Sequence, residues 1–120
     1  MQSSSRHILI ADDNRDAREL IRFLLERSGY TVSEAIDGQD ALEKIDAHRP
    51  DLVLLDLMMP VMDGWTVLER LRSRADPPRI VVLSGYADQS RAMAAGARGF
   101  VPKPFRPGEL LATCSGALAA

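Results

Sequence analysis

The sequence has little cysteine and few aromatic residues. Cys114 is the only cysteine among 120 residues, so neither an internal disulfide nor a metal site built from cysteines can form. Such a composition is typical of proteins from a reducing compartment, and we expect a cytoplasmic location. One Trp, two Tyr and three Phe leave the core to aliphatic side chains, and they argue against a surface on which nucleic-acid bases stack.

The chain also lacks a strong charge of either sign and a long apolar run. Its 15 Lys and Arg residues oppose 17 Asp and Glu residues, for a net charge of -2, which argues against nucleic acid or an anionic membrane as a partner. The apolar run 8–11 is too short for a signal peptide. The most apolar stretch, 52–62, contains Asp56 and Pro60, so it does not fit a membrane span.

The length suits one domain. We expect the polar residues 1–6 to be disordered and residues 7–120 to fold together. Apolar runs predict strands at 7–11, 31–35, 52–55, 80–83 and 99–101. Helical spacing predicts helices with inward-facing positions at Ala17, Leu20, Ile21, Leu24 and Leu25, at Ala41, Leu42 and Ile45, at Val67, Leu68 and Leu71, and at Leu111, Cys114 and Leu118. A short, weak helix is expected at 88–95.

The alternation of strands and helices indicates the fold class. The strands are apolar throughout rather than at every second residue, which is the pattern of a parallel sheet covered by helices on both faces. The chain is therefore predicted to be a doubly wound α/β domain. In such sheets ligands bind beyond the carboxyl ends of the strands, so the residues that follow each strand are the first candidates for a site.

Five chemically distinctive residues stand at these ends: Asp12, Asp13, Asp56, Ser84 and Lys103. Taken singly, an Asp there is often a helix N-cap, a Ser before Gly a turn, and a Lys a solvated charge. One N-cap, however, does not require both Asp12 and Asp13, and it does not explain Asp56 at the end of an apolar strand. Only two of the 15 cationic residues are lysines, so Lys103 is a notable choice for a compact positive charge.

The chemistry of these groups points to phosphoryl transfer. Two carboxylates about 5 Å apart repel by roughly 3 kcal/mol at an effective dielectric of about 20, so three of them require a counter-charge. Carboxylate oxygens are ligands that Mg²⁺ prefers. A carboxylate nucleophile, a divalent cation, a hydroxyl donor and an ammonium are the parts needed for phosphoryl transfer to an Asp. We therefore hypothesise an aspartyl phosphate.

The same residues carry a family resemblance. The motifs are Asp12-Asp13, Asp56, Met59-Pro60 to Asp63-Gly64, Ser84-Gly85, Gly96-Ala97 and Lys103-Pro104-Phe105. In this order they resemble the receiver domain of response regulators in two-component systems, over Ile8 to Leu111. The resemblance implies a flavodoxin-like (βα)5 fold with strand order 2-1-3-4-5, so that residues 7–120 would be a cytoplasmic receiver domain in phosphorelay signalling.

The resemblance also implies a phosphoacceptor and a metal site. Asp56 would take a phosphoryl group from a histidine kinase or a phosphotransfer protein. Asp12, Asp13 and Asp56, with the backbone carbonyl of Met58, would hold Mg²⁺. The domain would then signal to a downstream protein, and dimerisation with a second copy is left open. It would catalyse only its own phosphorylation and dephosphorylation and would not be an enzyme in the usual sense.

Four further roles follow from the resemblance. Ser84 would bind one phosphoryl oxygen and Lys103 another, and Pro104 would follow a cis peptide bond. Ser84 and Phe100 would form the switch, in which an aromatic ring turns inward as the hydroxyl residue moves toward the phosphate. Phe100 lacks the hydroxyl of the commoner tyrosine, so its ring is expected to rest inward without phosphate, and an ordinary core aromatic is the equal alternative for it.

The chain also departs from the family pattern in length, and the last helix looks short as well. The segment between Ser84 and Phe100 is about three residues shorter than usual, close to one helical turn, so we expect a shortened fourth helix.

Met58 and Tyr86, two residues after Asp56 and Ser84, are bulky and predict slow self-dephosphorylation by hindering an attacking water, unless both side chains point into solvent.

Two alternatives remain beside the phosphoacceptor hypothesis. A degenerate receiver would be a constitutive protein-binding module whose shortened fourth helix locks one conformation. A small Mg²⁺-dependent phosphohydrolase with an Asp nucleophile is less well supported, because Asp12-x-Asn14 replaces the expected pair of aspartates and the chain has no room for a substrate cap.

Overall fold

A computed structural model of the protein describes residues 6–119. One parallel sheet has the strand order β2-β1-β3-β4-β5, which confirms the expected order. The strands are β1 (His7–Ala11), β2 (Thr31–Ala35), β3 (Leu52–Asp56), β4 (Arg79–Ser84) and β5 (Gly99–Pro102). Residues 1–5, most of the segment expected to be disordered, lie outside the described residues, as does residue 120.

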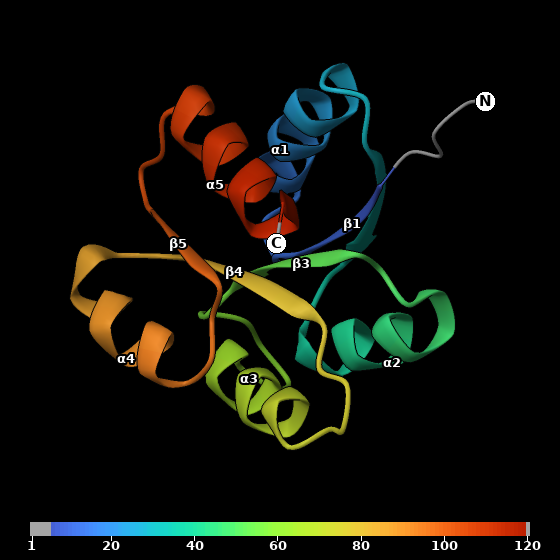
Figure 1. The fold of residues 1–120 in the computed structure, drawn as a ribbon, viewed down its shortest axis with the longest axis vertical. Helices are drawn as coiled ribbons and strands as arrows, with labels where there is room; N and C mark the ends of the chain where they lie inside the picture. The colour runs from blue at the N-terminus through green and yellow to red at the C-terminus, as the bar shows by residue number, and fades with distance from the viewer. Residues whose placement is uncertain (1–5, 120) are drawn as a thin grey trace.

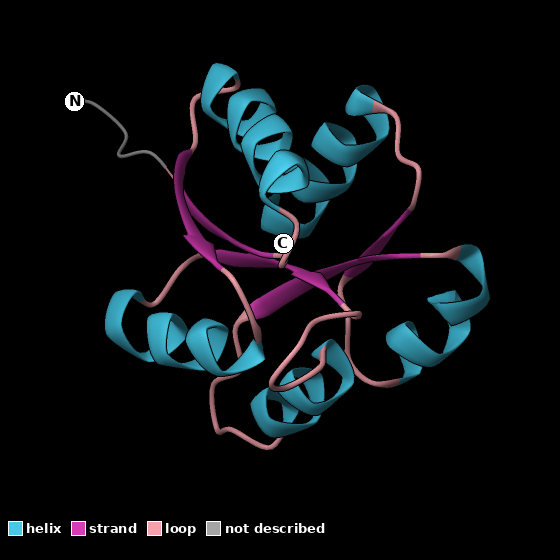
Figure 2. Ribbon diagram, turned by 180° about the vertical axis from the view of Figure 1, so that it is seen from behind, coloured by secondary structure: helices cyan, strands magenta, loops and turns pink. Residues whose placement is uncertain are grey.

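Helices cover both faces of the sheet. They are α1 (Arg15–Arg27), α2 (Gly38–His48), α3 (Gly64–Arg72), α4 (Gln89–Ala94) and α5 (Pro107–Ala119). Figure 1 shows α1 and α5 on one face and α2, α3 and α4 on the other, and Figure 2 shows the same two layers from behind. None of the helices in the described part is long and apolar enough to cross a membrane.

The core is aliphatic and divided by the sheet into two clusters. Alternate strand residues point to opposite faces, so Leu9 and Val53 pack beneath α2 and α3 while Ile8 and Leu54 pack beneath α1 and α5. Both faces of β3 are therefore buried. This burial explains the uninterrupted apolar strands, because a strand covered on both sides has no face left for polar residues.

Two helix faces differ from expectation in detail. Leu20 is 50% exposed, because the buried stripe of α1 is formed by Ile21 and Leu25 alone and Leu20 lies at its flank. In α5 the fully buried leucine is Leu110, and Leu111 is only partly buried. Leu110 shares a stripe with the buried Cys114, four residues later, and this stripe faces the sheet.

Side-chain caps fix where three of the helices begin. Asn14, Asp37 and Asp63 each accept a hydrogen bond from the backbone N–H three residues later, as N-cap residues do. The N-cap of α1 is Asn14, whose Oδ1 accepts from the backbone N–H of Ala17 at 2.8 Å, and not the neighbouring Asp13. Asp13 is therefore left available at the carboxyl end of β1.

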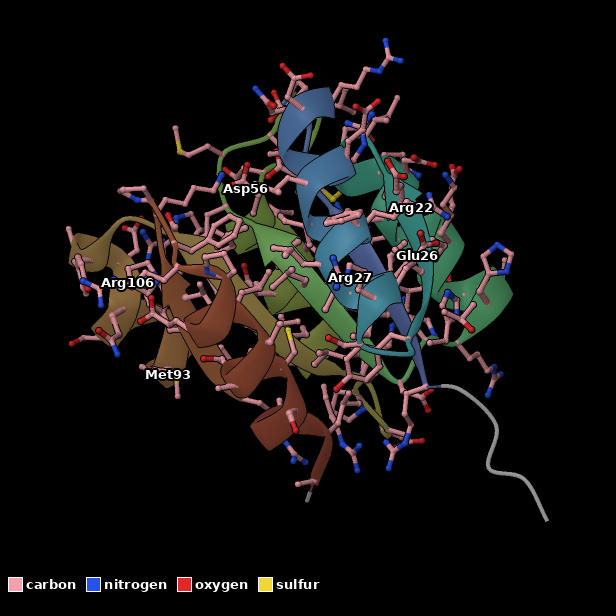
Figure 3. All side chains as sticks on the ribbon, turned by 90° about the horizontal axis from the view of Figure 1, so that it is seen from above. Arg22, Glu26, Arg27, Asp56, Met93 and Arg106 are labelled. Carbon is pink, nitrogen blue, oxygen red and sulfur yellow. The ribbon has the colours of Figure 1, made fainter. Side chains whose placement is uncertain are left out.

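The outer edge of β2 is closed by side chains. Arg22 Nη2 donates to the carbonyl of Val32 at 2.9 Å, and Lys44 Nζ donates to the carbonyl of Glu34 at 2.6 Å. The Glu34 carboxylate forms ion pairs with Arg18 and Arg22, and Figure 3 labels Arg22 beside Glu26 on α1. Charged side chains along an edge strand discourage pairing with another chain. Lys44, the second of the two lysines, is thus used structurally.

The fourth helix is short, as expected. α4 has six residues, whereas α1 and α5 have 13 each. A 3-10 turn over Tyr86–Asp88 precedes it. The chain between β4 and α4 is therefore helical in part, but as a 3-10 turn and not as an extension of α4.

Gly64 allows α3 to start directly against β3, which yields a stability prediction. A Cβ atom at Gly64 would lie 2.5 Å from the carbonyl oxygen of Asp56 and 2.6 Å from the Cα of Leu57. Both are backbone atoms that cannot turn aside. We expect Gly64→Ala to lower the free energy of unfolding by roughly 2 kcal/mol, measured by urea denaturation.

Gly116 is the matched control for this substitution. It also lies in a helix, and a Cβ there would have open space. Gly116→Ala should raise the free energy of unfolding by about 1 kcal/mol, because alanine is the better helix former. Equal effects of the two substitutions would show that the α3–β3 contact is not tight.

Candidate functional site

The candidate site lies at the carboxyl end of the sheet. Asp12 and Asp13 follow β1, Asp56 ends β3, Ser84 ends β4 and Lys103 follows β5. The chain leaves β1 toward one side of the sheet and β3 toward the other, so these ends flank the point where the winding reverses. Figure 3 labels Asp56 where β3 ends. The structure thus brings the sequence-predicted residues to one edge.

Three carboxylates form the centre of the site. Ligand oxygens of Asp12, Asp13 and Asp56 all lie within 4.8 Å of one another. Asp12 is 1% exposed and Asp56 is 4% exposed, whereas Asp13 is exposed. Asp12 Oδ1 accepts a hydrogen bond from the backbone N–H of Asn14 at 2.9 Å. The cluster is therefore open on the Asp13 side and fixed on the other.

Lys103 supplies the cation inside this cluster. Its Nζ lies 3.4 Å from Asp56 Oδ1 and 3.5 Å from Asp12 Oδ2. The backbone N–H of Lys103 donates to the carbonyl of Ser84 at 2.8 Å, and the Lys103–Pro104 peptide bond is cis. One ammonium against three carboxylates leaves the site with an excess of negative charge.

Burial and the excess of negative charge both weaken the acidity of Asp56. Burial, followed by the negative charge of Asp12, raises the pKa of Asp56 from 3.8 to about 6. The Lys103 ammonium and the backbone N–H of Met58, which donates to Asp56 Oδ1 at 3.3 Å, act in the opposite direction. Burial and the Asp12 charge outweigh the Lys103 ammonium and the Met58 N–H, so the pKa of Asp56 is raised overall.

The donor atoms fit a hard divalent cation. All three candidate ligands are carboxylate oxygens, and this is the one group of potential metal ligands found among residues 6–119. Mg²⁺ prefers oxygen ligands and is commonly held by one or two carboxylates with water and phosphate oxygens. A divalent cation here would balance the charge that Lys103 leaves uncompensated.

Ser84 has a partner that the sequence reasoning missed. Its side chain is 5% exposed, and Ser84 Oγ lies 2.8 Å from Asp88 Oδ2. Asp88 was assigned only to the beginning of the short fourth helix. Its position four residues after Ser84, on the loop that leaves β4, was the signal available in the sequence.

The remaining candidates lie around this centre. Phe100 is 9% exposed and packs in the cluster beneath α2, α3 and α4, a position that suits an inward-resting switch aromatic and an ordinary core aromatic equally. Met58 and Tyr86 are 74% and 71% exposed, so both side chains lie largely in solvent, as in the alternative to hindrance of an attacking water.

Comparisons with known proteins agree with this geometry. A family model described as "Response regulator receiver domain" matches residues 8–115. "Response regulator MprA" of Mycobacterium ulcerans (strain Agy99) is 47% identical over 111 residues, which are 90% of this chain and 48% of that protein. The chain spans about half the length of the curated relatives it matches.

Solved structures show the same fold. The chemotaxis response regulator CheY4 of Vibrio cholerae has a TM-score of 0.87 at 31% identity, over 95% of this chain and 99% of that one. The signal receiver domain of a signal transduction histidine kinase from Syntrophus aciditrophicus has a TM-score of 0.88 at 28% identity, over 96% and 91% of the two chains.

The raised pKa of Asp56 predicts how stability depends on pH. The folded protein holds the Asp56 proton more tightly than the unfolded chain, whose pKa is near 3.8. This contribution to stability is complete below about pH 4 and is lost as the pH rises through about 6. In EDTA, we expect Asp56→Asn to remove this loss and to raise the free energy of unfolding at neutral pH by an amount on the order of 2 kcal/mol.

Urea denaturation across this pH range is the measurement. Asp12→Asn should also stabilise the protein at neutral pH, because it removes one partner of the repulsion. The control is Asp76→Asn, which neutralises an exposed carboxylate in the loop before β4 and should change little. Unchanged or lower stability in both site variants would contradict the crowding of charge.

Proposed function

Since this chain belongs to the family of response regulator receiver domains, we propose that Asp56 is its phosphoacceptor and takes a phosphoryl group from a histidine kinase or a phosphotransfer protein. The observation that carries this proposal is the position of the Asp56 carboxylate. It is 4% exposed at the end of a central strand, with the Lys103 ammonium 3.4 Å away and two further carboxylates beside it.

The proposed reaction is an in-line displacement at phosphorus. An Asp56 carboxylate oxygen attacks the phosphorus atom, and the bond from phosphorus to the donor's histidine nitrogen breaks with its electron pair going to that nitrogen. Asp56 must be ionised to attack, so its raised pKa favours transfer at neutral rather than acidic pH. Catalysis of this kind consists of positioning and charge neutralisation.

The proposed metal ligands are Asp12, Asp13, Asp56 and the backbone carbonyl of Met58. When bound, Mg²⁺ would supply positive charge for the phosphoryl oxygens. The Asn14 N–H holds the Asp12 carboxylate in position for this role, and Asn14 rather than Asp13 is the N-cap of α1. The three carboxylate oxygens within 4.8 Å of one another support this assignment.

Ser84 and Lys103 would bind the transferred group. The Lys103 ammonium already lies within 3.5 Å of two carboxylates, so it needs little movement to contact a phosphoryl oxygen on Asp56. The Ser84 hydroxyl would donate to a second oxygen, and Phe100 would be the aromatic member of the switch. A downstream protein that recognises the altered surface is the proposed recipient of the signal.

Intact-mass measurement after incubation with a small phosphodonor and Mg²⁺ tests the phosphoacceptor. We expect one added phosphoryl group in the parent protein and in Asp76→Asn, and none in Asp56→Asn or in the presence of EDTA. Modification of Asp56→Asn to the same extent would refute the assignment. Continuous release of phosphate from a phosphomonoester would favour the phosphohydrolase alternative instead.

The lifetime of the phosphoryl group tests the proposed role of two bulky residues. Met58 and Tyr86 are bulky and come two residues after Asp56 and Ser84, and we propose that they hinder an attacking water although both are largely exposed. We expect Met58→Asn and Tyr86→Ala to shorten the lifetime several-fold, because a polar or smaller side chain admits and positions water. Val61→Asn, which alters an 81% exposed apolar residue of the same loop, is the control and should leave the lifetime unchanged.

A further inference from the structure

The Ser84 hydroxyl is committed to a protein acceptor. It is 2.8 Å from Asp88 Oδ2, and because an ionised carboxylate only accepts hydrogen bonds, the hydroxyl must be the donor. A hydroxyl has one proton to donate. While Ser84 donates to Asp88, it cannot donate to an oxygen of a group on Asp56.

Helix capping does not explain the orientation of the Asp88 carboxylate. Asp88 occupies the N-cap position of α4, yet its side chain makes no capping hydrogen bond there. The side chains at the equivalent positions of α1, α2 and α3 all cap their helices. Those three N-caps have extended backbones, whereas Asp88 closes the 3-10 turn with a helical backbone (φ -92°, ψ -4°). Its carboxylate therefore does not cap α4 and instead accepts the hydrogen bond from Ser84.

The Phe100 ring is already buried, so phosphorylation does not need to turn it inward. Its ring is 9% exposed and packs in the core, in the same structure in which Ser84 bonds to Asp88. The inward ring and the Ser84–Asp88 hydrogen bond thus coexist. In this chain an inward turn of the aromatic ring is not required to accompany movement of the hydroxyl, so the hydrogen bond of Ser84 is the part of the switch that is left to change.

We propose that Asp88 is a positioning residue that holds the Ser84 hydroxyl away from the phosphoryl site and opposes the phosphorylated conformation. This inference rests on the proposed function of Asp56 and deepens it. A phosphoryl oxygen on Asp56 competes with the Asp88 carboxylate for the single proton of Ser84. When the phosphoryl oxygen accepts that proton, the Asp88 carboxylate, at the end of the 3-10 turn that leads into α4, loses its partner. Exchange of one hydrogen bond then connects the chemistry at Asp56 to the beginning of α4.

The protein contains its own reporter for α4. Trp65 is the only tryptophan and lies at the start of α3. The Arg91 guanidinium of α4 lies 3.9 Å above its ring. A shift of α4 changes the surroundings of the indole, so Trp65 fluorescence reports binding at the site through the response of α4.

Titration with beryllofluoride in the presence of Mg²⁺ tests the proposal. Beryllofluoride is an inorganic mimic of a phosphoryl group and attaches to a carboxylate oxygen. We expect Asp88→Ala to bind it roughly tenfold more tightly than the parent protein, since the competing hydrogen bond to a charged acceptor is gone. Because Asp88→Ala also removes a negative charge, Glu109→Gln serves as the charge control. Glu109 lines a cavity of about 830 Å³ together with Tyr86 and Pro104.

A double-substitution cycle separates hydrogen bonding from charge. In a Ser84→Ala background, Asp88→Ala should no longer tighten binding, because the hydroxyl for which the two acceptors compete is absent. A tightening that persists in this background, or that Glu109→Gln reproduces, would show a charge effect and overturn the proposal. An affinity that Asp88→Ala lowers or leaves unchanged would do the same, and it would show that Asp88 only stabilises the loop.

The proposed function fails differently. If the parent protein shows neither beryllofluoride binding nor phosphoryl uptake, Asp56 is not a phosphoacceptor and the inference falls with it. If the parent binds beryllofluoride and Asp88→Ala does not bind it more tightly, only the role of Asp88 is refuted.

Discussion

The repulsion among three carboxylates at the carboxyl end of the sheet is the constraint on which this structure depends. Asp12 and Asp56 are almost fully buried, and the raised pKa of Asp56 shows that Lys103 does not offset burial and the charge of Asp12. The cluster is maintained because aliphatic packing holds the strands that carry it. Both faces of β3 are covered by aliphatic side chains, and the free energy of this burial holds Asp56 in place against the charge.

The same constraint explains why the site suits phosphoryl chemistry. A site with excess negative charge favours a divalent cation, and the cation in turn makes it possible for an anionic phosphoryl group to approach a carboxylate. Lys103 contributes because it contacts two of the carboxylates at once. A guanidinium would deliver its charge through a broad planar group, whereas an ammonium fits between them as a compact charge.

The sequence predicted the strands and the strand-end residues well for a physical reason. A strand buried on both faces must be apolar along its length, so Leu52–Leu55 and Ile80–Leu83 were visible without knowledge of the fold. Flanking positions on helices were less certain, since Leu20 and Leu111 lie at the margin of a buried stripe, where one helical step of about 100° decides exposure. The partner of Ser84 was not predicted, because the four-residue spacing to Asp88 does not by itself select among the several acceptors within reach of a hydroxyl at a strand end.

The short α4 gives that unpredicted contact its importance. A helix of six residues is too short to be stable through its own backbone hydrogen bonds, so its position is set by contacts with its surroundings. Ala92 is fully buried and Arg91 lies over Trp65, but the first turn has no side-chain cap. Because α4 continues directly from the 3-10 turn Tyr86–Asp88, a change in the hydrogen bond between Ser84 and Asp88 acts at its start. The shortness of α4 therefore gives weight to the contact between Ser84, at the end of β4, and Asp88, at the end of the 3-10 turn.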